Sequence, residues 1–520
     1  MSRMLSLEAK IGQLLMFGFT GTSVSPHMKE YIVKHNLGGI IHFSRNVENP
    51  RQLAELNEEF QDLAKLSPSG SELLITIDQE GGTVARITTG VTVLPSAMAL
   101  GAADSEELTE KACGVAGLEL RAMGINMNLA PVVDVNNNPL NPVIGVRSFG
   151  EDPERVAKLG AAAIRGYQRH VAAVAKHFPG HGDTDLDSHL ALPVIPHDRQ
   201  RLDKVELRPF KEAIAQGVAA IMTAHVVFPA IETTPGLPST LSYQVLTKLL
   251  REEMGFDGLV MTDCMEMAAV KDTYGIVEAS IMAIEAGADI VLVSHTEKLQ
   301  NDAFEALVAA VRSGRITEER IDESLARIQK AKEALNQEQP ELAVVGSPGH
   351  IEVIRDAIRQ SLTLVRSKDN LPLQGERVLV VEPLRQATNI AEDVLMDMGT
   401  LTLSLRANGL DSVADCSVEM GVSAEDHSKV LSQAQAYDKV VVVTADAHRH
   451  PGQARLVHEL VQGGGDIIVV GSGTPYELAE LPADITYLAS YGSRPLVWDE
   501  VAKVLLGKER ASGKLPVSPA

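Results

Sequence analysis

The chain has 520 residues, of which 45% are hydrophobic and 22% are charged, a composition typical of a soluble globular protein with two or more domains. Its 47 basic and 69 acidic residues give a formal net charge of −22. Because such a surface repels nucleic acids and anionic membranes, we expect neither as a partner.

Residues 1–335 alternate between short apolar runs and amphipathic segments, which is typical of parallel strands covered by helices. The predicted strands are 13–19, 39–43, 73–77, 126–133, 171–175, 219–223, 258–262 and 289–294. The predicted helices between them include 50–66, 105–123, 153–170, 203–216 and 242–253. Repeats of this kind predict a (β/α)8 barrel of the TIM type, with a doubly wound open sheet as the alternative.

Polar side chains follow the predicted strands. The groups concerned are Asp78 and Glu80 after the third strand, Asp134 after the fourth, Lys176 and His177 after the fifth, His225 after the sixth, Asp263 after the seventh and His295 after the eighth. Barrel enzymes build their active sites from the loops after the strands. The sequence therefore predicts a functional site at this end of the barrel.

The loop after the fifth predicted strand, PGHGDTDLDSH at 179–189, is unusually rich in titratable groups. It holds two histidines and three aspartates. A surface turn, a metal site and a catalytic loop are all compatible with this composition.

A second α/β pattern follows a polar segment, NQEQP at 336–340. Its predicted strands are 377–381, 439–444, 466–471 and 484–489, with helices between them. We therefore expect a barrel domain at 1–335, a linker at 336–350 and a smaller α/β/α sandwich domain at 351–520. The glycines at 463–465 precede a strand and do not join a strand to a helix, so they make a poor phosphate loop.

The cysteines and the N-terminal segment bear on the cellular compartment. Cys113, Cys264 and Cys416 are widely spaced and odd in number, so they indicate neither a disulfide framework nor a zinc site. In the segment MSRMLSLEAKIGQLLMFGF, the basic region and the cleavage site of a signal peptide are missing. No apolar run is long enough to span a bilayer. We expect a cytoplasmic protein, and a monomer.

Five motifs in matching order resemble glycoside hydrolase family 3, and in particular its β-N-acetylglucosaminidases. The motifs are DQEGG at 78–82, GVRSFGEDP at 145–153, KHFPGHGDTDLDSH at 176–189, MTAHVVFP at 222–229 and GFDGLVMTDCMEM at 255–267. The ending ASGKLPVS at 511–518 resembles the family's second domain. The resemblance implies a barrel, an α/β sandwich and hydrolysis of glycosides.

The resemblance also implies a retaining mechanism with a covalent intermediate. Asp263 matches the nucleophile, a role that suits a carboxylate because it is ionised at neutral pH and attacks an oxocarbenium-like centre. Asp187 and His189 match an Asp–His dyad in which His189 is the acid/base and Asp187 orients it. The alternatives are that Asp263 caps the following helix and that the dyad only stabilises its loop.

The sugar-binding residues implied by the resemblance are Asp78, Arg86, Arg147, Lys176 and His177, with His225 as a further candidate. Glu80 and Asp134 are expected to support them, and no metal or cofactor is expected. The expected substrate is a small carbohydrate with a terminal β-linked GlcNAc, such as a cell-wall muropeptide fragment or a chitooligosaccharide. The alternatives are a GlcNAc phosphorylase, a β-glucosidase or β-xylosidase, and a sugar-binding protein without catalysis.

Overall fold

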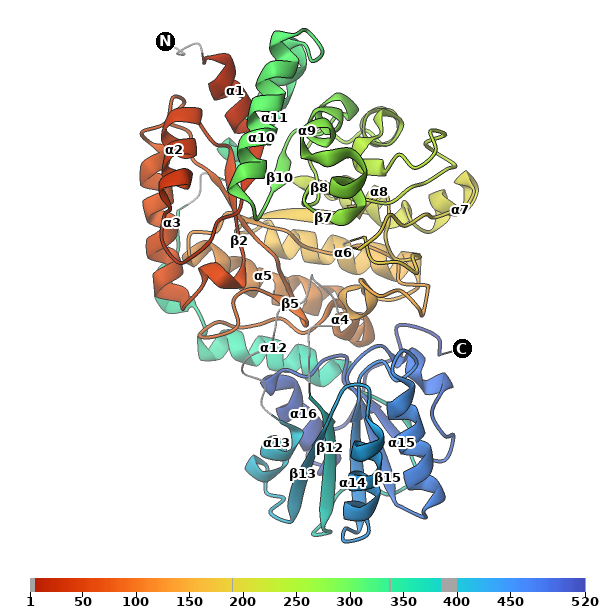
Figure 1. The fold of residues 1–520 in the computed structure, drawn as a ribbon. Coiled ribbons are helices and arrows are strands. Elements are labelled where there is room, and N and C mark those ends of the chain that lie inside the picture. The colour runs from red at the N-terminus through yellow and green to blue at the C-terminus, as the bar shows by residue number, and fades with distance from the viewer. Residues whose placement is uncertain (1–4, 189, 336–337, 385–399, 520) are drawn as a thin grey trace.

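The protein forms two lobes joined through one long helix (Figure 1). The structure is a computed structural model that describes residues 5–188, 190–335, 338–384 and 400–519. The larger lobe contains the N-terminal part of the chain, and the smaller lobe contains the C-terminal part. Helix α12 (Pro348–Ser361) lies between them.

The larger lobe is a barrel of parallel strands. In ring order the strands are β1 (Leu15–Phe17), β2 (Gly39–His42), β3 (Leu74–Ile77), β6 (Met127–Asn128), β7 (Ala172–Phe178), β8 (Ala220–Thr223), β9 (Leu259–Met261) and β10 (Val291–Val293). β10 pairs with β1, and a parallel bridge between Met261 and Ile290 joins the β9 and β10 segments. The predicted barrel is therefore confirmed, and the open sheet is excluded.

Burial explains why these strands appear as uninterrupted apolar runs in the sequence. Every residue within the eight barrel strands is buried. A parallel strand that is covered on both faces has no solvent-facing side on which polar residues could alternate. The helices that cover the barrel are α1 (Leu7–Gln13), α2 (Pro26–His35), α3 (Pro50–Ala64), α4 (Ala97–Ala103), α5 (Glu106–Ala122), α6 (Pro153–Tyr167), α7 (Arg199–Lys204), α8 (Arg208–Ala215), η4 (Gln244–Glu253), α9 (Ala268–Ala286), α10 (Glu297–Arg312) and α11 (Glu318–Ala334).

Several predicted boundaries in the barrel were wrong, and two of the differences have clear local causes. The segment 203–216 is not one helix, because α7 ends at Lys204 and α8 begins at Arg208, with Pro209 in its first turn, where the missing N–H group costs nothing. The strand predicted at 13–19 starts later, because Ser6 caps helix α1 and that helix runs through Gln13. A short antiparallel hairpin, β4 (Gln79–Gly81) and β5 (Val84–Ala85), follows β3.

The smaller lobe is an α/β/α sandwich around a six-stranded sheet. The strand order is β11 (Thr363–Arg366), β16 (Thr486–Ala489), β15 (Ile467–Gly471), β14 (Lys439–Thr444), β12 (Val378–Pro383) and β13 (Val413–Val418), and only β11 is antiparallel to its neighbour. Alternate residues of β12 pack into two different cores, with Val378 and Val380 on one side and Leu379 and Val381 on the other. α13 (Leu401–Ala407) and α16 (Pro495–Leu505) contribute to the first core, while α14 (Ala424–Ala434) and α15 (Pro451–Gln462) contribute to the second. The predicted sandwich is confirmed.

The segment that connects the lobes is bound to the barrel. The buried carboxylate of Glu119 on α5 accepts hydrogen bonds from the Thr92 and Gly346 backbone N–H groups, at 2.8 and 3.0 Å. His350 Nδ1 lies 2.8 Å from the same carboxylate. Helix α12 packs against α4, α5 and α16, and so contacts both lobes. The predicted linker at 336–350 includes residues 336–337, which lie outside the described residues, and the domain boundary stays a prediction.

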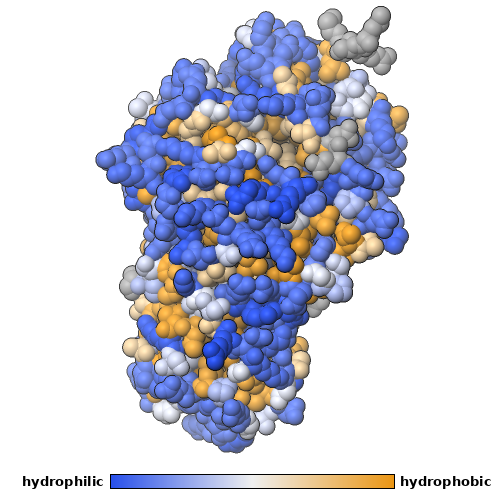
Figure 2. All heavy atoms as spheres, turned by 180° about the vertical axis from the view of Figure 1, so that it is seen from behind, coloured by the Kyte–Doolittle hydropathy of each residue, from blue (hydrophilic) through white to orange (hydrophobic). Residues whose placement is uncertain are grey.

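The surface of the two lobes differs in hydropathy. Figure 2 shows that hydrophilic side chains cover most of the back of the larger lobe, while apolar patches appear on the smaller lobe and near the junction. In the described part of the chain, no helix combines the length and the apolar character needed to cross a membrane.

Candidate active site

A cavity of about 530 Å³ lies at the carboxyl-terminal ends of the barrel strands. Its charged and imidazole-bearing lining residues are Arg45, Asp78, Glu80, Arg86, Arg147, Lys176, His177, His181, Asp263, Glu266 and His295. Lys176 and His177, which were expected after the strand, lie within β7, and the others lie on the segments that follow β2, β3, β6, β7, β9 and β10. The structure therefore brings together the predicted residues Asp78, Arg86, Arg147, Lys176, His177 and Asp263.

Asp78 follows β3 and is held between two cations. Lys176 Nζ lies 2.7 Å from Asp78 Oδ1, and Arg86 Nη2 lies 3.3 Å from Asp78 Oδ2. Burial opposes ionisation of this carboxyl, but the charges of Lys176 and Arg86 outweigh burial and hold its pKa below the usual range. Asp78 is therefore an ionised hydrogen-bond acceptor in the lining of the cavity.

Glu80 on the hairpin organises the other cations of the site. Its two oxygens accept from Arg147 Nε and Nη2 at 2.9 Å each, and Oε1 lies 2.8 Å from Lys176 Nζ. Burial again opposes ionisation, but Arg147 and Lys176 hold the pKa of Glu80 well below its usual range. In return, the nearby carboxylates outweigh burial and raise the pKa of both cations. We call the group formed by Asp78, Glu80, Arg86, Arg147 and Lys176 the charged wall.

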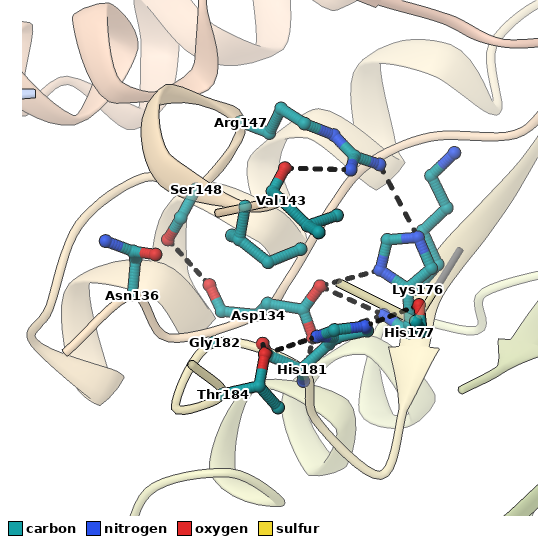
Figure 3. Close-up of polar contacts among 12 residues, drawn as sticks. Asp134, Asn136, Val143, Arg147, Ser148, Lys176, His177, His181, Gly182 and Thr184 are labelled. Carbon is teal, nitrogen blue, oxygen red and sulfur yellow. Dashed lines mark hydrogen bonds and ion pairs between the residues drawn. The ribbon is translucent and has the colours of Figure 1, made fainter. Parts of the chain in front are cut away.

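His177 and His181 share one buried carboxylate, that of Asp134 (Figure 3). His177 Nδ1 lies 2.7 Å from Asp134 Oδ2, and the His181 backbone N–H donates to Asp134 Oδ1 at 2.7 Å. Arg147 Nη2 lies 3.5 Å from His177 Nε2. A guanidinium can only donate, so His177 Nε2 accepts and its Nδ1 carries the proton that is donated to Asp134. This network fixes the ring of His177 against the cavity.

His181 anchors the titratable loop that follows β7. Its Nδ1 lies 3.0 Å from Thr184 Oγ1, and its Nε2 lies 2.9 Å from Ser188 Oγ. Burial and the neighbouring His177 lower the pKa of His181 to about 4, so the ring is neutral at pH 7. His181 thus ties the start of the loop to Ser188, which lines the cavity.

The predicted acid/base dyad lies on the same loop. Asp187 is buried beside Ser188, and its backbone carbonyl accepts from the Leu190 and Ala191 N–H groups. His189 lies outside the described residues. The roles of Asp187 and His189 stay predictions, and the position of Ser188 shows that the loop reaches the cavity.

Asp263 lines the cavity and lies two residues after the end of β9. Its Oδ1 accepts from the Cys264 backbone N–H at 2.7 Å, which fixes one carboxylate oxygen. His225 was predicted to contact the sugar but is not among the lining residues. It is buried, its Nδ1 lies 2.8 Å from Thr240 Oγ1, and its Nε2 lies 3.0 Å from the Cys264 carbonyl oxygen. This position favours support of the loop that carries Asp263, and direct binding of substrate by His225 stays a prediction.

Phe43, Arg45 and Glu266 also line the cavity and were missed by sequence reasoning, whereas His295 was expected there. Arg45 lies over the ring of Phe43 with its guanidinium carbon 4.3 Å from the ring centroid, and the rings of Phe43 and His295 are 4.9 Å apart. Glu266 accepts from the backbone N–H of His295 at 2.6 Å. All four residues follow strands β2, β9 or β10, so the rule that pointed to His295 could have pointed to the other three as well.

One group of potential metal ligands occurs among the described residues, away from the cavity lining. Ligand atoms of Asp183, His197 and Glu206 lie within 4.8 Å of one another. The Arg201 guanidinium lies 3.6 Å from Asp183 Oδ2 and 3.4 Å from Glu206 Oε1. Because a protein cation already balances these carboxylates, we assign no metal to them.

Comparisons with known proteins all point to one family. The model of the glycosyl hydrolase family 3 N-terminal domain matches residues 6–331. Beta-hexosaminidase A from Pseudoalteromonas piscicida is 33% identical over 547 aligned residues, which cover 96% of this chain and 92% of the relative. A protein from Cellulomonas fimi named beta-N-acetylglucosaminidase/beta-glucosidase is 31% identical and covers 86% of this chain and 83% of its own length. A solved family 3 beta-N-acetylglucosaminidase from Paenibacillus sp. str. FPU-7 superposes with a TM-score of 0.94 at 43% identity, covering 99% of both chains.

Proposed function

Because the chain belongs to glycosyl hydrolase family 3 and is therefore a glycoside hydrolase, we propose that it is a retaining, exo-acting β-N-acetylglucosaminidase. Its substrates would be small carbohydrates with a terminal non-reducing β-linked GlcNAc. Cell-wall muropeptide fragments and chitooligosaccharides are the substrate classes that we infer.

The observation that carries this proposal is the charged wall, which lines the same cavity as Asp263. Each carboxylate of the wall is paired with a cation, so the wall presents fixed acceptors and donors to the cavity. A site of this kind selects a sugar whose hydroxyl groups match it, because a missing partner leaves a buried polar group unsatisfied. A terminal sugar has those hydroxyl groups free, and this supports exo action.

The chemistry proceeds by double displacement in this proposal. Asp263 attacks the anomeric carbon while His189 donates a proton to the departing glycosidic oxygen, and a covalent glycosyl-enzyme forms. His189 then accepts a proton from the water that attacks the same carbon, and Asp263 departs. Imidazole suits both steps because it titrates near neutral pH. Asp187 orients the ring, and no step requires a metal or a cofactor.

Substrate comparison tests the proposal. Hydrolysis of the nitrophenyl β-glycosides of GlcNAc, glucose and xylose would be measured with and without phosphate, and the products would be identified by mass. We expect a strong preference for GlcNAc and free GlcNAc as product in both conditions. A preference for glucose or xylose would contradict the substrate assignment. Formation of GlcNAc 1-phosphate at a rate that depends on phosphate would instead identify a phosphorylase.

A further inference from the structure

The hairpin that carries Glu80 is held from the other lobe of the molecule. Arg494, the residue directly before α16, donates from Nε to the carbonyl oxygen of Gly82 at 2.6 Å. Gly82 lies in the turn between β4 and β5. We propose that Arg494 is a positioning residue that fixes this hairpin and thereby sets the geometry of the charged wall.

The turn of the hairpin packs closely against the barrel. Gly81 and Gly82 have φ angles of +103° and +56°, a region that glycine adopts without strain. A Cβ atom on Gly82 would lie 2.7 Å from Ser96 Cβ, so the backbone approaches this residue closely. The Gly82 N–H donates to the Leu94 carbonyl at 3.0 Å. The barrel thus holds the N–H side of the turn, and Arg494 holds the carbonyl side.

The space behind the hairpin makes the contact with Arg494 important. A cavity of about 310 Å³ lies between the lobes and is lined by Gly82, by parts of the segment 88–96 and by the segment 492–497. A cavity wall lacks packing partners on its open side, so side-chain packing supports the hairpin poorly there. The hydrogen bond to Arg494 is therefore a main restraint on movement of the turn toward this cavity.

Movement of the hairpin would reach the sugar through Glu80. This carboxylate makes two contacts with Arg147 and one with Lys176, all at 2.8–2.9 Å. Hydrogen bonds weaken steeply when their geometry changes, so a shift of Glu80 would displace both cations. No described residue of the segment 338–519 lines the active-site cavity. The described part of the smaller lobe thus acts on substrate binding without lining the cavity.

This inference rests on the proposed function for its kinetic readout, and three variants of the full chain test it. Arg494→Met keeps the side chain as far as the position of Nε but has no donor. Arg494→Gln places an amide nitrogen the same number of bonds from Cα as Arg Nε, so it restores a donor without the charge. Ser518→Ala is the matched control, because it removes another contact between the lobes, from Ser518 Oγ to Glu151 at 2.6 Å.

The measured quantities are KM and kcat on nitrophenyl GlcNAc and the inhibition constant of GlcNAc. Arg494→Met should raise KM and the inhibition constant by about tenfold, which corresponds to about 1.4 kcal/mol of binding free energy, with a smaller change in kcat. Arg494→Gln should stay within about twofold of the wild type because its amide donates in the same place. Ser518→Ala should leave all three constants unchanged. Wild-type constants in Arg494→Met, or equal defects in Arg494→Met and Arg494→Gln, would overturn the proposal.

A second readout separates this inference from the proposed function. Hydrogen exchange of the peptide 79–86 needs no turnover, and it should be faster in Arg494→Met than in the wild type and in Arg494→Gln. If the wild type does not act on nitrophenyl GlcNAc, the substrate assignment fails while the exchange result still decides the role of Arg494. Unchanged exchange in Arg494→Met would contradict that role. Arg494→Ala provides a second donor-free variant if Arg494→Met does not fold.

Discussion

Replacing Glu80 with glutamine removes the negative charge at the centre of the charged wall. The side chains of Arg147 and Lys176 are 5% and 3% exposed, so both cations would keep their charge with little water to solvate it. Breaking a buried ion pair by removing one partner costs about 3–5 kcal/mol. Lys176 keeps Asp78 at 2.7 Å, so we expect the lower end, a loss of about 3 kcal/mol in the free energy of unfolding. The displaced cations should also lower kcat/KM by about a hundredfold.

The assay is urea denaturation together with steady-state kinetics on nitrophenyl GlcNAc. Glu154→Gln is the control, because Glu154 also pairs through two contacts with an arginine, Arg208, at 2.7 and 2.9 Å, but on the surface. The control should lose less than about 1 kcal/mol and keep its kcat/KM. If Glu80→Gln keeps the wild-type kcat/KM, the charged wall does not depend on Glu80, and the reasoning fails.

Three further predictions concern the smaller lobe, the acid/base loop and the domain boundary. Burial raises the pKa of Glu477 from its ordinary value of 4.5 to about 7, so the folded state binds a proton that the unfolded state releases. The free energy of unfolding should therefore fall as the pH rises from 4.5 to about 7. In urea titrations, Glu477→Gln should lack this part of the pH dependence. The same pH dependence in the wild type and in Glu477→Gln would contradict the prediction. His189→Ala should be much slower with a poor leaving group than with a dinitrophenyl leaving group, and adding Asp187→Ala should cost little more; equal losses on both substrates would argue against the dyad. Limited proteolysis should cut within 336–350 first, and stable fragments that divide within 171–295 would count against an intact barrel.

The barrel could be predicted because its strands are buried on both faces. Eight short apolar runs identified the eight strands, although several boundaries moved by one or more residues. The two edge strands of the smaller lobe were missed. β13 mixes buried, half-buried and exposed residues along VADCSV without regular alternation, and β11 has Leu364 at 40% exposure, so neither forms a continuous apolar run. A strand with one neighbour and a half-exposed face gives the weaker sequence signal.

The site could be predicted in position but not in pairing. Its residues follow successive strands, so the chain order alone places them at one end of the barrel. The contact of Glu80 with Arg147 spans 67 positions in the chain, and no local pattern indicates it. His225 is a second example of a contact that the sequence does not indicate. Its position after a strand does not determine that its ring contacts Thr240 and the Cys264 carbonyl oxygen.

The role of the smaller lobe could not be derived from the sequence either. Arg494 lies 412 positions from Gly82, and nothing in the segment before α16 identifies a residue that contacts the hairpin. The contact depends on the relative orientation of the two lobes, both of which pack against α12. Such inter-lobe geometry follows from packing of surfaces that are far apart in the chain.

The central claim is that Asp263 forms a covalent bond to the sugar, and trapping of that intermediate tests it most directly. The enzyme would be incubated with a 5-fluoro derivative of GlcNAc that carries a good leaving group, and the digested protein would be analysed by mass spectrometry. The account predicts a peptide that contains residues 259–267 and carries one sugar on Asp263. A sugar on a different residue, or turnover that inverts the anomeric centre without any labelled peptide, would contradict it.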